Sequence, residues 1–276
     1  MSLQVFQHVL AEMVMSPGFR VAVQDNAEQA LVTFQLTSQE RQRLATIAHD
    51  PGVKIGTMIH RSFRIGMFAN RLPRTCTALG TQELQRMLLE YWETHPPQTL
   101  FYAQEAARFA SFVSAQIAQG KLYNPYVEAV LKLELGLIEL ASSSGIPEQG
   151  APDIEHISLD MSVATHPACR VIQFDHDPNI LLPSLNAGEI PETVPRGEYY
   201  ILLKRSTDGQ MHTHQISSTL GVVLLICNEP RTLAWLQDYN VLTTDNAATL
   251  IHSGYLCVWQ HTTEYMTSSV EEQLVV

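Results

Sequence analysis

The sequence predicts an α+β protein, with an N-terminal all-helical bundle followed by a smaller α+β domain that contains an antiparallel hairpin. In the first half, apolar residues recur every three or four positions, as on one face of a helix. In the second half, short apolar or alternating runs flank an Asp-Gly turn, as antiparallel strands do. A Ser, Gly and Pro stretch without apolar periodicity separates the halves. We therefore expect domains at residues 1–145 and 155–276, joined by a linker at 146–154.

Breakers and caps delimit the helices of the first half. Thr37 and Glu40 have the spacing of a capping box that opens a helix. Pro96 ends another helix, because a proline disfavours helix in the residue before it. In the helix near 56–70, we expect Ile59, Phe63, Met67 and Phe68 on the apolar side. His60, Arg61 and Arg64 are expected on other faces. Helices are expected near residues 5–15, 38–49, 56–70, 81–94, 101–119 and 125–141.

The second half shows strand patterns around a tight turn. Residues 169–174 and 199–204 are strand candidates, and Asp208-Gly209 indicates a hairpin over 199–216. Periodicity alone leaves residues 220–226 ambiguous between helix and strand. We expect a short helix at 232–238, another from 247 to about 254, and a final strand at 255–259.

Composition bounds the class of protein. The 276 residues carry 17 Lys+Arg and 28 Asp+Glu, a net charge of −11, which disfavours a nucleic-acid coat or a polybasic membrane binder. The 45% hydrophobic content is typical of a packed globular protein. We expect no membrane span and no signal peptide. The four cysteines are far apart and form no CxxC pair, which favours free thiols and a cytoplasmic location.

A basic island interrupts this acidic chain. Residues 41–74 hold seven cations and a single carboxylate, a net +6, so the remainder carries −17. Cations at this density can dock an acidic protein surface, contact a nucleic-acid backbone, or form a solvated helix face. The candidate partner- or nucleic-acid-binding residues are Arg61, Arg64, Arg71 and Arg74.

Other motifs give weaker signals for chemistry. His212 and His214 lie two apart on a predicted strand, so both imidazoles face the same way and are weak metal-ligand candidates. A third ligand from His166, Asp175, His176 or Asp177 is conceivable, but the spacing matches no recognised metal site. Cys76 has no base beside it in the sequence, and the common catalytic motifs are absent. The sequence therefore predicts no catalytic residue, no metal and no cofactor.

Three helical segments resemble the N-terminal domain of the HvfC-like family. These are RSFRIGMFANRLPRTCTALG (61–80), LLEYWETHPPQTLFYAQEAARFASFV (88–113) and YVEAVLKLELGLIELA (126–141). In the second half, ATHPACRVIQF (164–174) and YYILLKRSTDGQMHTHQIS (199–217) resemble the family's His-Pro-x-x-Arg strand and its hairpin. The resemblance covers about residues 56–240, while residues 10–44 are similar to a helical module of peptide-maturation systems. The order and spacing of these short motifs carry most of the resemblance.

The resemblance implies a function in the maturation of ribosomal peptides. Members of the family act as non-catalytic partners of a TIM-barrel multi-iron oxygenase of the methanobactin-synthesis type, and the two proteins together bind a precursor peptide. The helical domain of this family is also described as DNA-binding. The resemblance therefore implies an alternative, a DNA-binding transcriptional regulator that uses the basic segment 41–74.

A peptide-presenting partner needs an open sheet edge. The hairpin 199–216 is the candidate, and the expected peptide-binding edge strand contains Tyr199, Ile201, Leu203 and Arg205.

Overall fold

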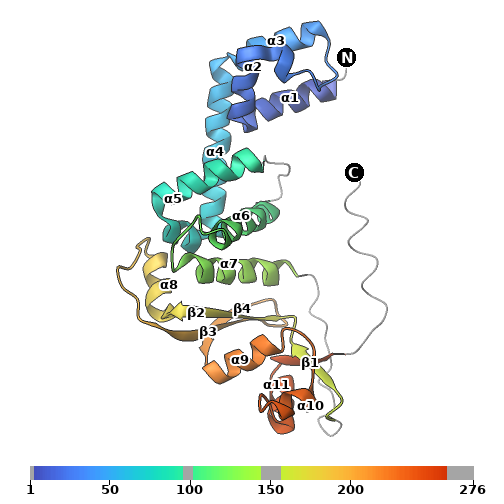
Figure 1. The fold of residues 1–276 in the computed structure, drawn as a ribbon, viewed down its shortest axis with the longest axis vertical. Coiled ribbons are helices and arrows are strands. Elements are labelled where there is room, and N and C mark those ends of the chain that lie inside the picture. Colours follow the sequence, from blue (N-terminus) through green and yellow to red (C-terminus); the bar gives the residue numbers. More distant parts are fainter. Residues whose placement is uncertain (1–2, 96–101, 144–156, 260–276) are drawn as a thin grey trace. The chain divides into compact units, whose positions relative to one another are not determined.

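The computed structural model describes residues 3–95, 102–143 and 157–259 (Figure 1). It confirms the α+β class: seven helices precede the first strand of the described chain. The chain divides into two compact units, each built from two segments. The first unit is Met1–Ile138 with Asn179–Val194, and the second is Glu139–Pro178 with Pro195–Val276.

The first unit is helical, and four of its helices begin at prolines. Pro17 and Pro73 each occupy a first helical position, where the missing N–H leaves no hydrogen bond unmade. The predicted capping box is confirmed, since Thr37 and Glu40 exchange hydrogen bonds at the start of α3. The helices are α1 (Leu3–Met15), α2 (Pro17–Ala30), α3 (Ser38–Ala48), α4 (Pro51–Arg71), α5 (Pro73–Thr94), α6 (Tyr102–Ala118), α7 (Val127–Ser142) and α8 (Pro178–Asn186).

Two cores lie along the first unit. Helices α1–α3 enclose a small apolar cluster that includes Val9, Met13 and Leu44. Helix α4 packs on α1 and also on α5 and α6, where Phe68, Tyr91 and Phe109 form an aromatic core with ring centroids 4.6–6.2 Å apart. Because α4 takes part in both groups of contacts, its rotation about its own axis decides which side chains the unit buries.

The start of α5 is capped by a residue 60 positions away in the sequence. The helix has no side-chain cap of its own at Leu72. Instead Glu134 of α7, which is 2% exposed, accepts the N–H of Arg74 at 2.8 Å and the N–H of Thr75 at 3.0 Å. One carboxylate thus accepts hydrogen bonds from two of the free backbone N–H groups at a helix start. Its negative charge also interacts favourably with the positive end of the helix dipole.

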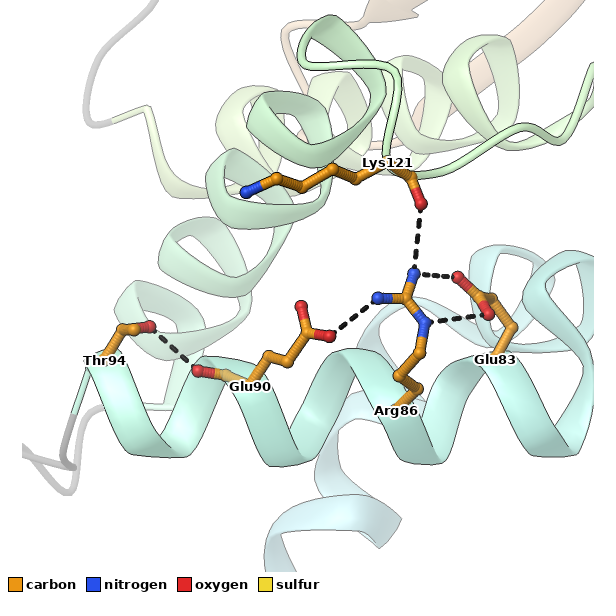
Figure 2. A network of polar contacts seen from close by, with 5 residues as sticks. All are labelled: Glu83, Arg86, Glu90, Thr94 and Lys121. Atoms are coloured by element: carbon orange, nitrogen blue, oxygen red, sulfur yellow. Dashed lines mark hydrogen bonds and ion pairs between the residues drawn. The ribbon is translucent and has the colours of Figure 1, made fainter.

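A polar network fixes the outer side of α5 (Figure 2). Arg86 lies between Glu83 and Glu90 of the same helix, and its guanidinium also donates to the carbonyl of Lys121 at 3.2 Å. These carboxylates raise the pKa of Arg86. The network ties α5 to the segment between α6 and α7.

The second unit contains two three-stranded antiparallel sheets, with strand orders β5-β1-β6 and β2-β3-β4. The predicted hairpin is confirmed, with Gly209 at φ 85° in its turn. The strands are β1 (Ser162–Thr165), β2 (Cys169–His176), β3 (Arg196–Arg205), β4 (Met211–Ile216), β5 (Arg231–Thr232) and β6 (Leu256–Trp259). The helices are α9 (Ser218–Ile226), α10 (Leu233–Asp238) and α11 (Thr244–His252).

Helix α9 resolves the ambiguous apolar run. Ser217 caps it by accepting the N–H of Leu220. Gly221 allows α9 to lie against the sheet, because a Cβ at this position would come within 2.3 Å of the Tyr200 ring. Tyr200 and Leu202 then join Val223 and Leu224 in the core of the unit.

The observed division of the chain differs from the expected one. The predicted linker 146–154 lies outside the described residues. Residues 179–194 belong to the first unit, although the sequence placed them in the 155–276 domain. The contacts of this segment explain the difference: Asn186 accepts a hydrogen bond from Nε of Arg74 at 2.8 Å, and Ile190 lies over Gly80.

We expect Glu134→Ala to lower the free energy of unfolding by about 3 kcal/mol, because two backbone N–H groups lose their acceptor. Urea unfolding followed by circular dichroism measures the change. Glu128→Ala is the control, since Glu128 is an exposed residue of the same helix and its loss is expected to cost less than about 0.5 kcal/mol. Equal losses in both variants would contradict the capping function of Glu134.

Candidate functional site

Arg64 is buried in the first unit and does not face solvent. It is 3% exposed and ion-paired with Glu105 of α6, which is 4% exposed. The guanidinium carbon lies 6.0 Å from the ring centre of Trp92 on α5. Burial lowers the pKa of Arg64 to about 10. The prediction that Arg64 binds a partner or a nucleic acid is therefore wrong, because its charge is paired with Glu105 inside the helical core.

The other predicted arginines have different surroundings. Arg61 lies over Trp92, with 5.3 Å between its guanidinium carbon and the ring centre, and burial and the nearby charge of Arg20 lower its pKa. Arg74 is engaged with Asn186, and its Nη1 lies 3.9 Å from Glu134. Arg71 is exposed at the end of α4. The four residues thus do not form one cationic patch.

The burial of Arg64 turns an apolar face of α4 outward. Ile55, Met58 and Ile59 are 57%, 60% and 65% exposed, and Phe63 is 54% exposed. The expectation that Ile59 and Phe63 mark the buried side is therefore wrong. The sequence contained a signal for this outcome, because residues 53–68 are apolar on more than one face and Glu105 is the one acidic residue of an otherwise largely apolar helix.

The outward face of α4 leads into a groove. Ile65 and Ala69 of α4, together with residues of α5, line an open cavity of about 720 Å³. Its floor and walls are mainly apolar and include Leu84, Leu88 and Ile190. Cys76 also lines the groove, but burial raises the pKa of its thiol to about 12, which keeps it protonated and a poor nucleophile at neutral pH.

The strand expected to form a sheet edge is the central strand of its sheet. Strand β3 is paired to β2 on one side and to β4 on the other. The interpretation of Tyr199, Ile201, Leu203 and Arg205 as a peptide-binding edge is therefore wrong. Ile201 and Leu203 are 4% and 0% exposed, and Arg205 donates to the carbonyl of Leu140 at 3.1 Å and to that of Ser143.

The sheet edge lies instead on β4, the second strand of the predicted hairpin. Among the described residues, β4 pairs only with β3, and the side chains of residues 212–215 are exposed. The bond from the N–H of Ser206 to the carbonyl of Gln210 closes the hairpin. Since antiparallel pairs alternate along a ladder, this closure makes Lys204–His212 a hydrogen-bonded pair and turns the backbone of Thr213 outward.

The histidine pair does not acquire further metal ligands. His212 and His214 lie on β4, opposite Lys204 and Leu202. Within the described residues, no three His, Cys, Asp or Glu side chains gather as a metal site. His176 lies at the other end of the sheet, opposite Arg196. Ser206 Oγ lies 3.3 Å from Nε2 of His212.

The three cysteines of the second unit are buried. Burial raises the pKa of Cys169 and Cys227 to about 11 and also raises that of Cys257. Across the described ranges, no helix is long and apolar enough to cross a membrane.

Comparison with known proteins gives no match, either to a family model or to a curated protein. The resemblance to the HvfC-like family thus remains a prediction. The geometry of the described residues offers two candidate surfaces: the β4 edge in the second unit and the outward face of α4 in the first.

We expect Arg64→Met to lower the free energy of unfolding by about 3–5 kcal/mol, because it leaves the Glu105 carboxylate buried without a counter-charge. The double variant Arg64→Met/Glu105→Leu should recover most of that loss, since no charge is then buried. Arg71→Met should stay within about 0.5 kcal/mol of wild type. Urea denaturation measures all three, and a double variant as unstable as the single one would argue against a buried pair.

Proposed function

We propose that this protein is a non-catalytic partner subunit that binds a ribosomal precursor peptide and presents it to a multi-iron oxygenase. The observation that carries the proposal is the β4 edge of the second unit: β4 is the terminal strand of its sheet among the described residues, and its side chains at 212–215 are exposed. An edge of this kind accepts an extended peptide as an additional strand.

The sheet gives such an edge a rigid support. Strand β3 behind it is buried at Tyr200, Ile201, Leu202 and Leu203, so the position of β4 is set by the core rather than by a loop. Backbone hydrogen bonds at an edge depend little on the sequence of the added peptide, whereas alternate side chains supply specificity. A subunit of this design can hold a peptide in register while another protein supplies the chemistry.

The identity of the enzyme rests on the family resemblance. The hairpin 199–217 and the helical segments of 61–141 carry it, and a cytoplasmic partner of an iron enzyme is what it implies. The proposal needs no cofactor in this chain.

We expect Thr213→Pro to abolish peptide binding, because proline removes an outward N–H from the edge, while an edge strand tolerates the residue. Thr213→Ala is the matched control, since it keeps that N–H. The tagged chain is purified from its own host, and the eluate is analysed for bound peptides by mass spectrometry and for a co-purifying iron protein. Equal peptide recovery with both variants, or an eluate of the wild-type chain without iron protein, would contradict the proposal.

A DNA-binding regulator is the second candidate, supported by the exposed cations Arg43, Lys54 and Arg71 of α3 and α4. Because Arg64 is buried, it cannot reach the bases from the helix face that this function would use. In gel-shift titrations with DNA at two salt concentrations, we expect the wild-type chain and Arg43→Ala/Arg71→Ala to behave alike. Salt-sensitive binding that is lost in this double variant would favour the DNA function instead.

A further inference from the structure

The outward face of α4 has the composition of an interior surface. Taking 3.6 residues per turn, Ile55, Met58, Ile59 and Ile65 fall within about one third of the helix circumference. The opposite side holds Val53, Thr57, Arg64 and Phe68, all of them buried. A helix with apolar residues on two opposite sides is typical of one that is covered on both. Here one of the two sides is exposed.

This face and the groove beyond it form one continuous surface. From Ile55 to Ala69 the face is about 21 Å long, and Ile65 and Ala69 at its end also line the cavity of about 720 Å³. Small residues (Ser62, Gly66) lie between the apolar ones, and Gly66 has open space around its Cβ position. The surface thus has the length of about four helical turns and ends in a mainly apolar hollow.

Charge indicates which helix would fit. Helix α4 contains Lys54, Arg61, Arg64 and Arg71 and no acidic residue. Glu105 compensates Arg64, whereas Lys54 and Arg71 are exposed near the two ends of the helix and form no ion pair with any described residue. Taking 3.6 residues per turn, Lys54 and Arg61 lie along one edge of the outward face, whereas Arg71 lies on the opposite side of the helix. A ligand helix with carboxylates along the matching edge of its apolar stripe would meet complementary charge there.

The available area also favours a single helix. A stable dimer of globular proteins buries about 800 Å² on each partner, from about 20–30 residues a side. The exposed apolar residues of this face are Ile55, Met58, Ile59 and Ile65 of a single helix. Helix-in-groove recognition needs only anchors at i, i+3, i+4 and i+7. We infer that the outward face of α4, with its groove, is the docking site for an amphipathic, acidic-flanked helix of a partner protein. This inference rests on the proposed function only in assigning that helix to the partner enzyme.

The test uses the full chain and two synthetic amphipathic peptides of about 18 residues, long enough to span the face. Both carry the same leucine stripe, flanked by Glu in one and by Lys in the other, and both are labelled for fluorescence anisotropy. We expect the Glu peptide to bind at least tenfold more tightly than the Lys peptide. Ile59→Asp should weaken the Glu peptide at least tenfold.

The control is Val32→Asp, because Val32 and Ile59 are each 65% exposed and Val32 belongs to the segment between α2 and α3, outside α4 and outside the residues that line the groove. It should change the affinity less than twofold. Equal effects of the two variants, equal binding of the two peptides, or no saturable binding would overturn the inference. So would a dimer in analytical ultracentrifugation that Ile59→Asp abolishes, because a second copy would then occupy the face.

The tagged-chain purification separates this inference from the proposed function. If the Ile59→Asp variant still co-purifies with the iron protein, the outward face of α4 is not where the enzyme binds, and the proposed function stands. If the wild-type chain binds the Glu peptide as expected but recovers no iron protein, the docking surface stands and the proposed function fails.

Discussion

The first unit depends on the ion pair between Arg64 and Glu105. Moving two charges out of water costs several kcal/mol each, so such a pair persists only where its geometry and neighbours hold it in place. Here Trp92 lies beside the guanidinium, and α4 and α6 supply one charge each. Since Arg64 must point toward Glu105, the rotation of α4 is fixed, and Ile55, Met58 and Ile59 point outward as a consequence.

Glu134 imposes the second constraint on the same helices. Burial raises the pKa of this carboxyl, while its hydrogen bonds with Thr75 and Arg74 act in the opposite direction. A buried acid is retained here because the start of α5 has no other cap. With Glu105 on α6 and Glu134 on α7, two carboxylates hold α4 and α5 in place, and the aromatic core around Phe68 fills the space between. The positions of α4 and α5 in the first unit therefore depend on buried polar contacts as well as on apolar packing.

Local signals predicted much of the fold. The capping box at Thr37, the Asp-Gly turn before Gln210 and the helix-breaking residues act over a few positions, so the sequence alone specifies them. The errors concern pairing over long distances. Neither the partner of Arg64 nor the strand on the far side of β3 can be found from spacing within one segment, because Glu105 is 41 residues away and β2 pairs across an intervening helix. The same limit placed residues 179–194 in the wrong domain.

The corrected candidate sites lie on the same two elements that the sequence indicated, the basic helix and the hairpin, but on other faces of them. The basic helix stays a binding candidate, but through its isoleucines rather than Arg64. The hairpin stays a candidate peptide edge, but through β4 rather than β3. In both cases periodicity identified the element, and tertiary contacts decided which of its faces is free.

Solvent accessibility of individual side chains in solution tests the inverted face of α4 most directly. In methyl and guanidinium NMR spectra recorded with a soluble gadolinium chelate, the methyl groups of Ile55 and Ile59 should broaden strongly, as exposed groups do. The Nε–H signal of Arg64 should persist, with slow exchange, and the methyl groups of buried Ile172 and Ile201 should remain sharp. Protected Ile55 and Ile59 methyls together with a fast-exchanging Arg64 would show that α4 faces the other way and would contradict the account.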